Sequence, residues 1–248
     1  MKKRILSLSG GKDSTAMLLK LIHLHTESTV PPIDEIVFFD TGMEFQAIYD
    51  NIDRLKTLCA QQYNIPFTTL YPQIPFEEKM FEITVHKRNG TIGKGYSWCG
   101  GVCRWGTTEK LKALERHCKN SFELVGLAFD EKQRLAKERN GNKIFPLEMW
   151  KMTEADALQC CYNCGYEFKE DAGAGEIRLY DYLDRVSCWC CGNKNLKELR
   201  NMYLYMPKYW QKLREFQART DRPFRRSGET IFDLEERFKI ELQEKVNK

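Results

Sequence analysis

The chain has 248 residues, of which 42% are hydrophobic and 30% charged, and its formal net charge is +4. This length suits one large α/β domain with at most a small appendage, and the composition excludes a disordered or fibrous protein. No apolar run approaches the roughly 20 residues that a membrane-spanning helix needs, so we expect a cytoplasmic protein without a membrane partner. Thiols stay reduced in that compartment, so the ten cysteines indicate metal or redox chemistry rather than a disulfide framework.

The first fifteen residues predict a strand, a glycine turn and a helix. The apolar run 4–8 ends at two adjacent glycines, Gly10 and Gly11, and the polar residues 13–15 open a segment with helical apolar spacing. Glycines allow a tight turn, and the free N–H groups of the new helix point at the same place. The stretch therefore predicts an anion site. Because Lys12 follows the glycines at once, the loop is too short to be a Walker A loop.

The motif Ser-Gly-Gly-Lys-Asp-Ser at residues 9–14 resembles the PP-loop of the adenine nucleotide α-hydrolase superfamily. A second buried strand, residues 35–40, ends in Asp-Thr-Gly, and this segment is similar to the strand end that helps to hold adenosine in phosphoadenosine phosphosulfate (PAPS) reductases. An ordinary turn built from capping residues is the alternative for 40–42. The resemblance implies that ATP or a sulfonucleotide binds at the ends of these strands. The expected nucleotide-binding residues are Ser7, Ser9, Gly10, Gly11, Lys12, Asp13, Ser14, Thr15, Asp40, Thr41, Gly42 and Gly126.

Alternating strand and helix patterns predict the fold. After the second strand come a helix at 44–63, a strand at 67–71, a long glycine-rich loop at 84–106, a helix from 107, and strands at 122–127 and 144–147. We expect an α/β, Rossmann-like (HUP-type) parallel sheet with crossover helices, plus a cysteine-rich, mostly helical C-terminal part. The expected domains are a PP-loop nucleotide-binding domain at 1–158 and a metal-binding helical region at 159–248.

Two further positions follow from the resemblance to PAPS reductases. Arg104 and Lys110 are candidates to contact the anionic end of the nucleotide, although either could be a solvated surface charge. The segment after Gly126 departs from the family pattern, because Ala128 stands where the family usually has arginine; Arg134 is the candidate to compensate. The expected catalytic residues are Lys12, Asp13 and Arg104.

Two C-x-x-C pairs, each followed by a glycine, have the spacing of a tetrahedral four-cysteine site for Zn²⁺ or a [4Fe-4S] cluster. The expected metal ligands are Cys161, Cys164, Cys188 and Cys191. A rival set, suggested by the likeness to iron–sulfur adenylylsulfate reductases, replaces the first pair by Cys99 and Cys103. Free buried thiols are the third possibility, and the sequence does not choose among the three.

The segment 194–226 has ten basic and three acidic residues, a balance of 10 − 3 = +7. Aromatic residues lie between the basic ones, which is typical of surfaces that bind nucleic acid such as tRNA, and also of ordinary amphipathic helices. Both interpretations stay open.

We expect an enzyme of the ATP pyrophosphatase type, with ATP/Mg²⁺ as cofactor and adenylyl transfer linked to sulfur transfer from a sulfur donor. One alternative is reduction of a sulfonucleotide by an internal cysteine such as Cys99 or Cys103, with a thioredoxin-like reductant. No cysteine follows Cys191, so the cysteine-bearing tail that PAPS reductases use to attack sulfur is missing. The other alternative is a non-catalytic module that binds a nucleotide or nucleic acid.

Overall fold

The structure, a computed structural model, describes residues 2–26, 33–86, 89–98, 103, 107–138 and 141–246. The chain forms two compact units whose segments alternate along the sequence. The sheet unit consists of Met1–Asp40, Gln46–Tyr71 and Lys110–Phe168, and the helical unit of Thr41–Phe45, Pro72–Glu109 and Lys169–Lys248. This division differs from the expected boundary at residue 158, which falls inside a helix of the sheet unit.

Five parallel strands form the core of the sheet unit, in the order β3-β2-β1-β6-β7. Their bounds are Arg4–Leu8 (β1), Glu35–Phe39 (β2), Phe67–Leu70 (β3), Phe122–Val125 (β6) and Lys143–Ile144 (β7). The order reverses between β1 and β6, and in open α/β sheets ligands bind where it does so. The α/β Rossmann-like sheet expected from the sequence is confirmed.

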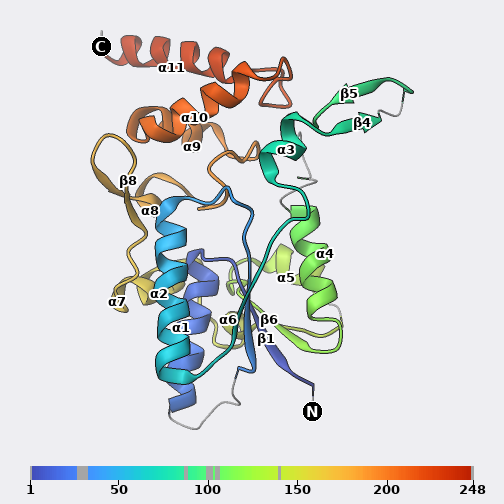
Figure 1. Ribbon diagram of the computed structural model, residues 1–248. Helices are drawn as coiled ribbons and strands as arrows, with labels where there is room; N and C mark the ends of the chain where they lie inside the picture. Colours follow the sequence, from blue (N-terminus) through green and yellow to red (C-terminus); the bar gives the residue numbers. More distant parts are fainter. Residues whose placement is uncertain are drawn as a thin grey trace. The chain divides into compact units, whose positions relative to one another are not determined.

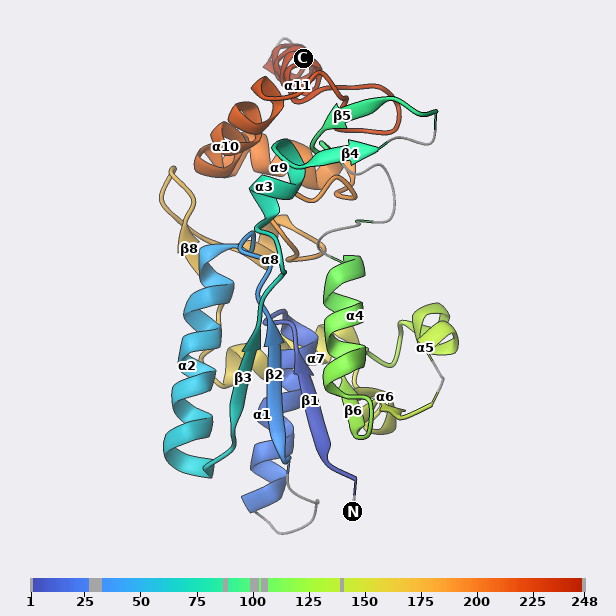
Figure 2. The same ribbon diagram turned by 45° about the vertical axis from the view of Figure 1, so that its right-hand side comes forward.

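Helices cover both faces of this sheet. They are α1 (Lys12–Thr26), α2 (Gln46–Tyr63), α4 (Thr107–His117, in this unit from Lys110), α5 (Lys132–Glu138), α6 (Pro146–Met149) and α7 (Glu154–Asn163). Figures 1 and 2 show α1 and α2 on one side of β1–β3 and α4 on the other. On the α4 side, Leu114 packs against Ile5 and Val37. Alternate strand residues face opposite sides, so β1 is covered on both faces.

Two sequence expectations about local structure were wrong. The strand expected at 144–147 stops at Ile144, because Pro146 starts α6 at a position where its fixed φ favours a helix. The loop expected at 84–106 contains an antiparallel hairpin, β4 (Thr84–His86) and β5 (Ile92–Lys94). Gly90 lies in its turn with φ +79°, a conformation that glycine adopts without steric cost.

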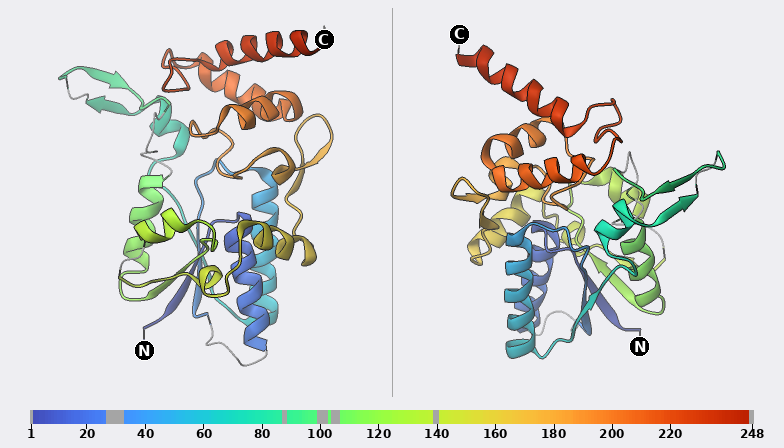
Figure 3. Two further views of the ribbon diagram at one scale, coloured as in Figure 1. Left: turned by 180° about the vertical axis from the view of Figure 1, so that it is seen from behind. Right: turned by 45° about the horizontal axis from the view of Figure 1, so that its top comes forward.

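The helical unit carries the remaining elements. They are α3 (Phe76–Phe81), the hairpin β8 (Lys169–Asp171) and β9 (Glu176–Arg178), α8 (Leu179–Tyr182), α9 (Leu196–Tyr205), α10 (Pro207–Ala218) and α11 (Ile231–Val246). Figure 3 shows α9, α10 and α11 following one another, with the β4–β5 hairpin extending away from them. Pro207 separates α9 from α10.

Aromatic side chains fill the interior of the helical unit. The rings of Phe45 and Tyr209 lie 4.6 Å apart between centroids, and those of Trp189 and Phe216 lie 5.1 Å apart. The buried Trp98 donates its indole N–H to Gln217 Oε1 at 3.0 Å. Over the described part of the chain, every helix is too short or too polar to cross a bilayer.

Candidate active site

The turn from β1 to α1 holds the PP-loop residues in one place. The backbone N–H of Ser9 donates to Ser14 Oγ at 3.0 Å, and the two serine hydroxyls lie 2.9 Å apart. Gly10 has φ +77°, and a Cβ there would lie 2.6 Å from Cγ2 of Ile48 on α2. Both the backbone conformation and the space therefore require glycine at this position.

Gly126, just beyond β6, lies directly against this turn. A Cβ at Gly126 would lie 2.7 Å from Ser14 Cα and 2.8 Å from Ser14 N. The end of β6 thus packs on the first turn of α1, which brings Gly126, a predicted nucleotide-binding residue, to the loop.

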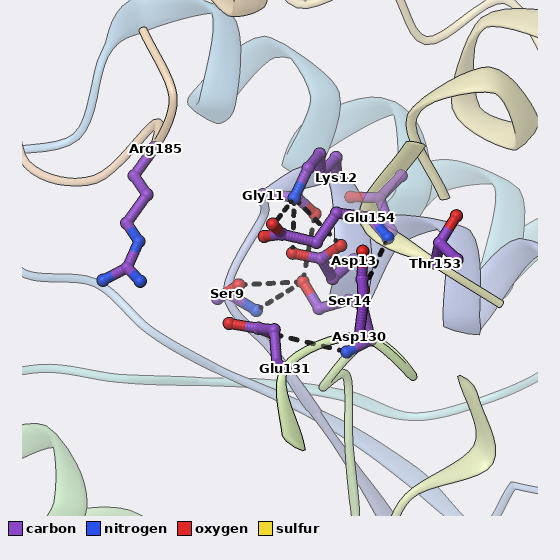
Figure 4. Close-up of polar contacts among 12 residues, drawn as sticks. Ser9, Gly11, Lys12, Asp13, Ser14, Asp130, Glu131, Thr153, Glu154 and Arg185 are labelled. Atoms are coloured by element: carbon purple, nitrogen blue, oxygen red, sulfur yellow. Dashed lines mark hydrogen bonds and ion pairs between the residues drawn. The ribbon is translucent and has the colours of Figure 1, made fainter. Parts of the chain in front are cut away.

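Lys12 lies between two carboxylates. Its ammonium is 3.0 Å from Asp13 Oδ2 and 3.0 Å from Glu154 Oε1, and the residue is 7% exposed. Figure 4 shows the lysine side chain between these two groups. Burial alone lowers the pKa of Lys12, but the nearby charges of Asp13 and Glu154 outweigh it, so the pKa is raised and the ammonium stays charged.

Three carboxylates converge beside Lys12. Oxygens of Asp13, Glu131 and Glu154 lie within 4.8 Å of one another, which makes them, among the described residues, a group that could hold a metal ion. Burial, with smaller contributions from Glu154 and Glu131, raises the pKa of Asp13 to about 6 against the opposing charge of Lys12. Carboxylate oxygens are the ligands that Mg²⁺ prefers, so the trio has the chemistry of a Mg²⁺ site.

Helix α7 holds Lys12 at two points. Thr153 and Asp156 form a capping box that starts the helix, and this places Glu154 in its first turn. The N–H of Glu154 donates to Asp130 Oδ1 at 3.0 Å. Two turns further on, the buried thiol of Cys161 donates to the carbonyl oxygen of Lys12 at 3.2 Å. One helix therefore fixes both the side chain and the backbone of the lysine.

Sequence reasoning missed Glu131 and Glu154. Acidic residues after a strand or in the first turn of a helix are common, because they cap the helix and interact well with its dipole. Only the pairing of β6 with β1 and the packing of α7 on α1 show that they meet the PP-loop.

The two expected cysteine pairs belong to different units. Cys161 and Cys164 are in the sheet unit, and Cys188 and Cys191 are in the helical unit. Burial raises the pKa of the Cys161 thiol, as do the neighbouring Cys160 and Asp13. A metal ligand must be a thiolate, and here the Cys161 thiol donates a hydrogen bond to the carbonyl oxygen of Lys12. The four-cysteine site remains a prediction.

The helical unit gathers thiols of its own. Cys188 Sγ lies 3.5 Å from Thr41 Oγ1 and 3.6 Å from Glu44 Oε1. Cys190 is buried, and burial raises its pKa well above the ordinary value, with further contributions from Cys188, Cys191, Cys103 and Glu44. These thiols are thus close enough for the charge on one to affect another. The hydroxyl of Thr41, a predicted nucleotide-binding residue, contacts Glu44 and Cys188.

Other predicted residues have varied surroundings. The hydroxyl of Ser7 bonds to the buried Glu123 carboxylate. Asp40, at the end of β2, accepts a hydrogen bond from Tyr49 Oη at 2.8 Å. Gly42 has φ +75° and open space where a Cβ would be, so it serves the turn.

Comparison with known families identifies the fold that carries this site. Residues 3–156 match the model of the phosphoadenosine phosphosulfate reductase domain. The chain belongs to the phosphoadenosine phosphosulfate reductase domain family.

Two curated relatives of this family member are uncharacterized proteins of Methanocaldococcus jannaschii. MJ0066 is 25% identical over 226 residues, which are 87% of this chain and 42% of the relative. MJ0973 is 30% identical over 210 residues, 80% of this chain and 44% of the relative. The chain thus spans less than half the length of these relatives. Among solved structures, the U34-tRNA thiolase NcsA from Methanococcus maripaludis, with its [4Fe-4S] cluster, aligns with 67% of this chain and 58% of its own at 19% identity and TM-score 0.43.

Within the PAPS reductase domain, the departure at Ala128 has a local explanation. Ala128 is fully buried, and its N–H donates to Glu131 Oε2 at 3.3 Å. Arg134 forms an ion pair with Glu131, so its guanidinium already contacts one member of the carboxylate trio. Arg104 and Cys99 lie outside the described residues.

Much of the positive charge of segment 194–226 is balanced within the helical unit. The ion pairs join Lys197 to Asp184, Arg200 to Glu241, Arg214 to Glu235, Arg219 to Glu77 and Glu82, and Arg225 to Glu229. Trp210 and Phe216 are 5% and 7% exposed and belong to the interior. The aromatic spacing therefore reflects inward-facing helix surfaces, and the exposed charge is smaller than the sequence count.

Proposed function

We propose that this PAPS reductase domain protein binds Mg·ATP at the PP-loop and catalyses adenylyl transfer to an acceptor oxygen, as the first half of a sulfur-transfer reaction. The observation that carries the proposal is the meeting of Lys12 with the carboxylates of Asp13, Glu131 and Glu154 at the loop. A polyphosphate alone would be repelled by three carboxylates. A divalent cation between them removes the repulsion, so the trio favours a metal–nucleotide complex.

In the first step, an acceptor oxygen attacks the α-phosphate of ATP, the bond from that phosphorus to the bridging oxygen breaks, and pyrophosphate leaves. Lys12 neutralises the charge that develops on the leaving group, and the N–H groups at the start of α1 bind its oxygens. Mg²⁺, held by Asp13, Glu131 and Glu154, would offset the phosphate charge. Glu154 also orients the ammonium of Lys12.

In the second step, the acceptor is a nucleobase carbonyl whose oxygen now carries AMP. Hydrosulfide attacks the carbon, a C–S bond forms, the C–O bond breaks, and AMP leaves with the oxygen. The carbon keeps its oxidation level, so no reductant is needed. Cys188 and Cys191 would be thiolate ligands of a metal or [4Fe-4S] centre, and such a centre would supply a binding site for the sulfur donor.

Reduction of a sulfonucleotide is the second candidate, supported by the family alone. That reaction requires a thiolate nucleophile. The internal cysteines that the sequence offers for this role are Cys99, which lies outside the described residues, and Cys103, which is half-buried.

The test measures AMP and pyrophosphate from radiolabelled ATP, with Mg²⁺, sodium sulfide and bulk tRNA as the acceptor probe. We expect AMP in the complete mixture and a loss of about 10²–10³-fold in Lys12→Met, since one charge-stabilising donor contributes that much. Glu154→Gln should raise the Mg²⁺ concentration needed for half-maximal rate. Lys119→Met, an exposed lysine on the same unit, is the control.

Each alternative has its own signature. Sulfite formed from adenylylsulfate and dithiothreitol without divalent metal would replace the proposal by the reductase reaction. ATP binding in calorimetry without any AMP, across acceptor probes, would support a non-catalytic nucleotide-binding module.

A further inference from the structure

Lys208 and Lys212, near the start of α10, carry positive charge that no carboxylate balances. Within the described residues neither ammonium forms an ion pair, in contrast to Lys197 on α9 and Arg214 on α10, which both do. The two lysines are four residues apart in one helix, so they are neighbours on the same face. The charge of the basic segment that stays unpaired is therefore partly concentrated here.

Both ammonium groups lie over aromatic rings. Lys208 Nζ is 5.6 Å from the ring centre of Tyr209, and Lys212 Nζ is 5.4 Å from the ring centres of both Tyr209 and Trp189. The two aromatic residues are 2% and 5% exposed, so the aliphatic stems of the lysines help to cover them while the charges stay at the surface. A ring attracts an ammonium without neutralising its charge. The ring of Tyr209 thus holds two cations on one small surface.

Two acidic residues near the lysines bond to other groups. Glu215, one turn after Lys212, accepts a hydrogen bond from Gln211 Nε2 at 3.0 Å. Asp171, at the end of β8, accepts from the N–H of Gly173 at 2.8 Å. Neither carboxylate forms an ion pair with the lysines in the part of the chain that the structure describes.

The start of α10 adds to the positive potential. Met206 gives the helix no side-chain cap, and the first turn contains no acidic residue. Lys208 is the second residue of the helix, near the positive end of the helix dipole, where an anion is favourable and a cation is not. Its backbone N–H donates to the carbonyl of Ala172 at 3.0 Å, and a Cβ at Gly173 would lie 3.1 Å from Lys208 Cβ. The turn of the β8–β9 hairpin, beside α10 in Figure 2, therefore fixes the backbone of Lys208.

This arrangement suits the phosphate groups of a nucleic acid. Like charges one turn apart repel each other, and an anion bound between them removes the repulsion. Phosphate oxygens accept charge-assisted hydrogen bonds from ammonium groups. Because Trp189 and Tyr209 are buried, their rings are not open for a base to stack on, so the contact would be with the sugar–phosphate backbone.

We propose that Lys208 and Lys212 bind backbone phosphates of a nucleic-acid acceptor. Trp189, under Lys212, follows Cys188 directly in the chain, so the bound backbone would lie beside the segment that the proposed function assigns to the sulfur donor. The inference rests on the nucleobase acceptor of the proposed function. It depends neither on adenylyl transfer nor on a metal centre.

The test measures binding of fluorescently labelled bulk tRNA to the full-length protein by anisotropy, without ATP, between about 50 mM and about 300 mM salt. Each phosphate contact contributes about 0.7–0.9 to the slope of log K against log salt concentration. Lys208→Met and Lys212→Met should each lower the slope by that amount, and the double variant by about twice as much. Near 0.1 M salt this corresponds to about 5-fold weaker binding per lysine and about 25-fold in the double variant.

The matched control removes the same net charge from the helical unit. Lys197→Met combined with Lys239→Met deletes two exposed lysines that are paired with Asp184 and Glu235. This variant should keep the slope of the wild type. Lys208→Arg combined with Lys212→Arg retains both charges and should also keep it.

Several results would overturn the inference. They are a wild type that does not bind tRNA, an unchanged slope in the double Met variant, an equal loss in the matched control, or failure of the double Met variant to unfold cooperatively as the wild type does. A DNA of similar length tests the source of the phosphates: a loss confined to tRNA assigns the site to RNA, and a loss for both supports a contact made to the phosphodiester alone. A chain that forms no AMP but loses tRNA affinity in the double Met variant would contradict the proposed reaction and leave this inference intact.

Discussion

Both the position and the charge of Asp13 are important for the proposed cation site. It lies close to Lys12 and to two other carboxylates, and in the proposed Mg²⁺ site it would have to be anionic when the cation binds. Burial and the neighbouring Glu154 and Glu131 oppose ionisation, and they raise its pKa to about 6 although Lys12 acts in the other direction. The ionised form of Asp13 is therefore unfavourable in this site, and a bound divalent cation would stabilise it.

This pKa predicts a pH dependence of cation binding. Below pH 6 the Asp13 carboxyl is protonated and neutral, and above it the group is anionic and able to bind a cation. The apparent Mg²⁺ affinity should be constant above that pH and fall about tenfold per pH unit below it, because one proton competes with the cation. Calorimetric Mg²⁺ titrations between pH 5 and pH 8 measure this.

Glu154→Gln is the matched variant for that titration. Glu154 raises the pKa of Asp13, so its loss should move the midpoint to lower pH, along with weaker binding. An affinity that stays flat down to pH 5 in the wild type would contradict the assignment of Asp13 as a ligand.

Among the individual site residues, the sequence predicts those of the loop itself but not the two glutamates that lie beside it. Lys12 and Asp13 follow from a local motif, which fixes a turn whatever surrounds it. Glu131 and Glu154 reach the loop through strand pairing and helix packing between distant segments, which a local pattern does not encode.

Among the elements, α7 and the end of β6 determine where the loop can lie. α7 contacts Lys12 through Glu154 and Cys161, and β6 ends at Gly126 against Ser14. Because the contacts of Cys161 and Gly126 are with backbone atoms of the loop, the loop has little room to adjust.

The close approach of β6 and α1 predicts the effect of Gly126→Ala. Its Cβ would lie 2.7 Å from Ser14 Cα, and no side-chain rotation relieves a backbone clash. We expect a loss of about 1–3 kcal/mol in the free energy of unfolding, as for other overpacked sites, with weaker ATP binding. Urea denaturation and calorimetry measure the two effects.

Gly141→Ala serves as the comparison for Gly126→Ala. Gly141 has φ +65° and nothing within 4 Å of a new Cβ, so the cost there is backbone conformation alone. ATP binding should survive that change. Equal losses of stability and binding in both variants would mean that the β6–α1 contact is not what sets the loop.

The sequence predicts helices and strands correctly where the apolar pattern is long. It fails where a single residue that favours a helix start determines the structure. The helix at 46–63 and the strands at 35–39 and 122–125 have clear apolar patterns. The apolar letters at 144–147 look like a strand, but Pro146 favours a helix start and overrides them.

At the scale of the molecule, the two units share the chain in alternating segments. The sheet unit continues to Phe168, which is 1% exposed, ten residues beyond residue 158, where the sequence suggests that a cysteine-rich region begins (168 − 158 = 10). Charge counts along the sequence are misleading for the same reason, because segments that are distant in the sequence belong to one unit. The +7 of segment 194–226 is offset by glutamates as distant as Glu77 and Glu82, so sequence distance is a poor guide to charge balance.

Because α7 continues beyond residue 158, it predicts how truncated chains unfold. A fragment 1–158 ends inside α7 and lacks Cys161, Tyr166 and Phe168, all of which are buried. It should lose cooperative thermal unfolding, followed by far-UV circular dichroism, whereas 1–168 should retain it. A sharp transition for 1–158 would show that the last turns of α7 are dispensable for the sheet.

The strand order also governs how the sheet unit is assembled during synthesis. β1 lies between β2 and β6, yet β6 ends at Val125, 55 residues after β3 ends at Leu70 (125 − 70 = 55). Translation adds roughly 5–20 residues per second, so one edge of β1 stays unpaired for about 3–11 s after β1, β2 and β3 have been made. During that interval the nascent chain offers an apolar strand edge to any other chain nearby. The rate at which the ribosome crosses residues 71–125 therefore sets how long the growing protein depends on protection from aggregation.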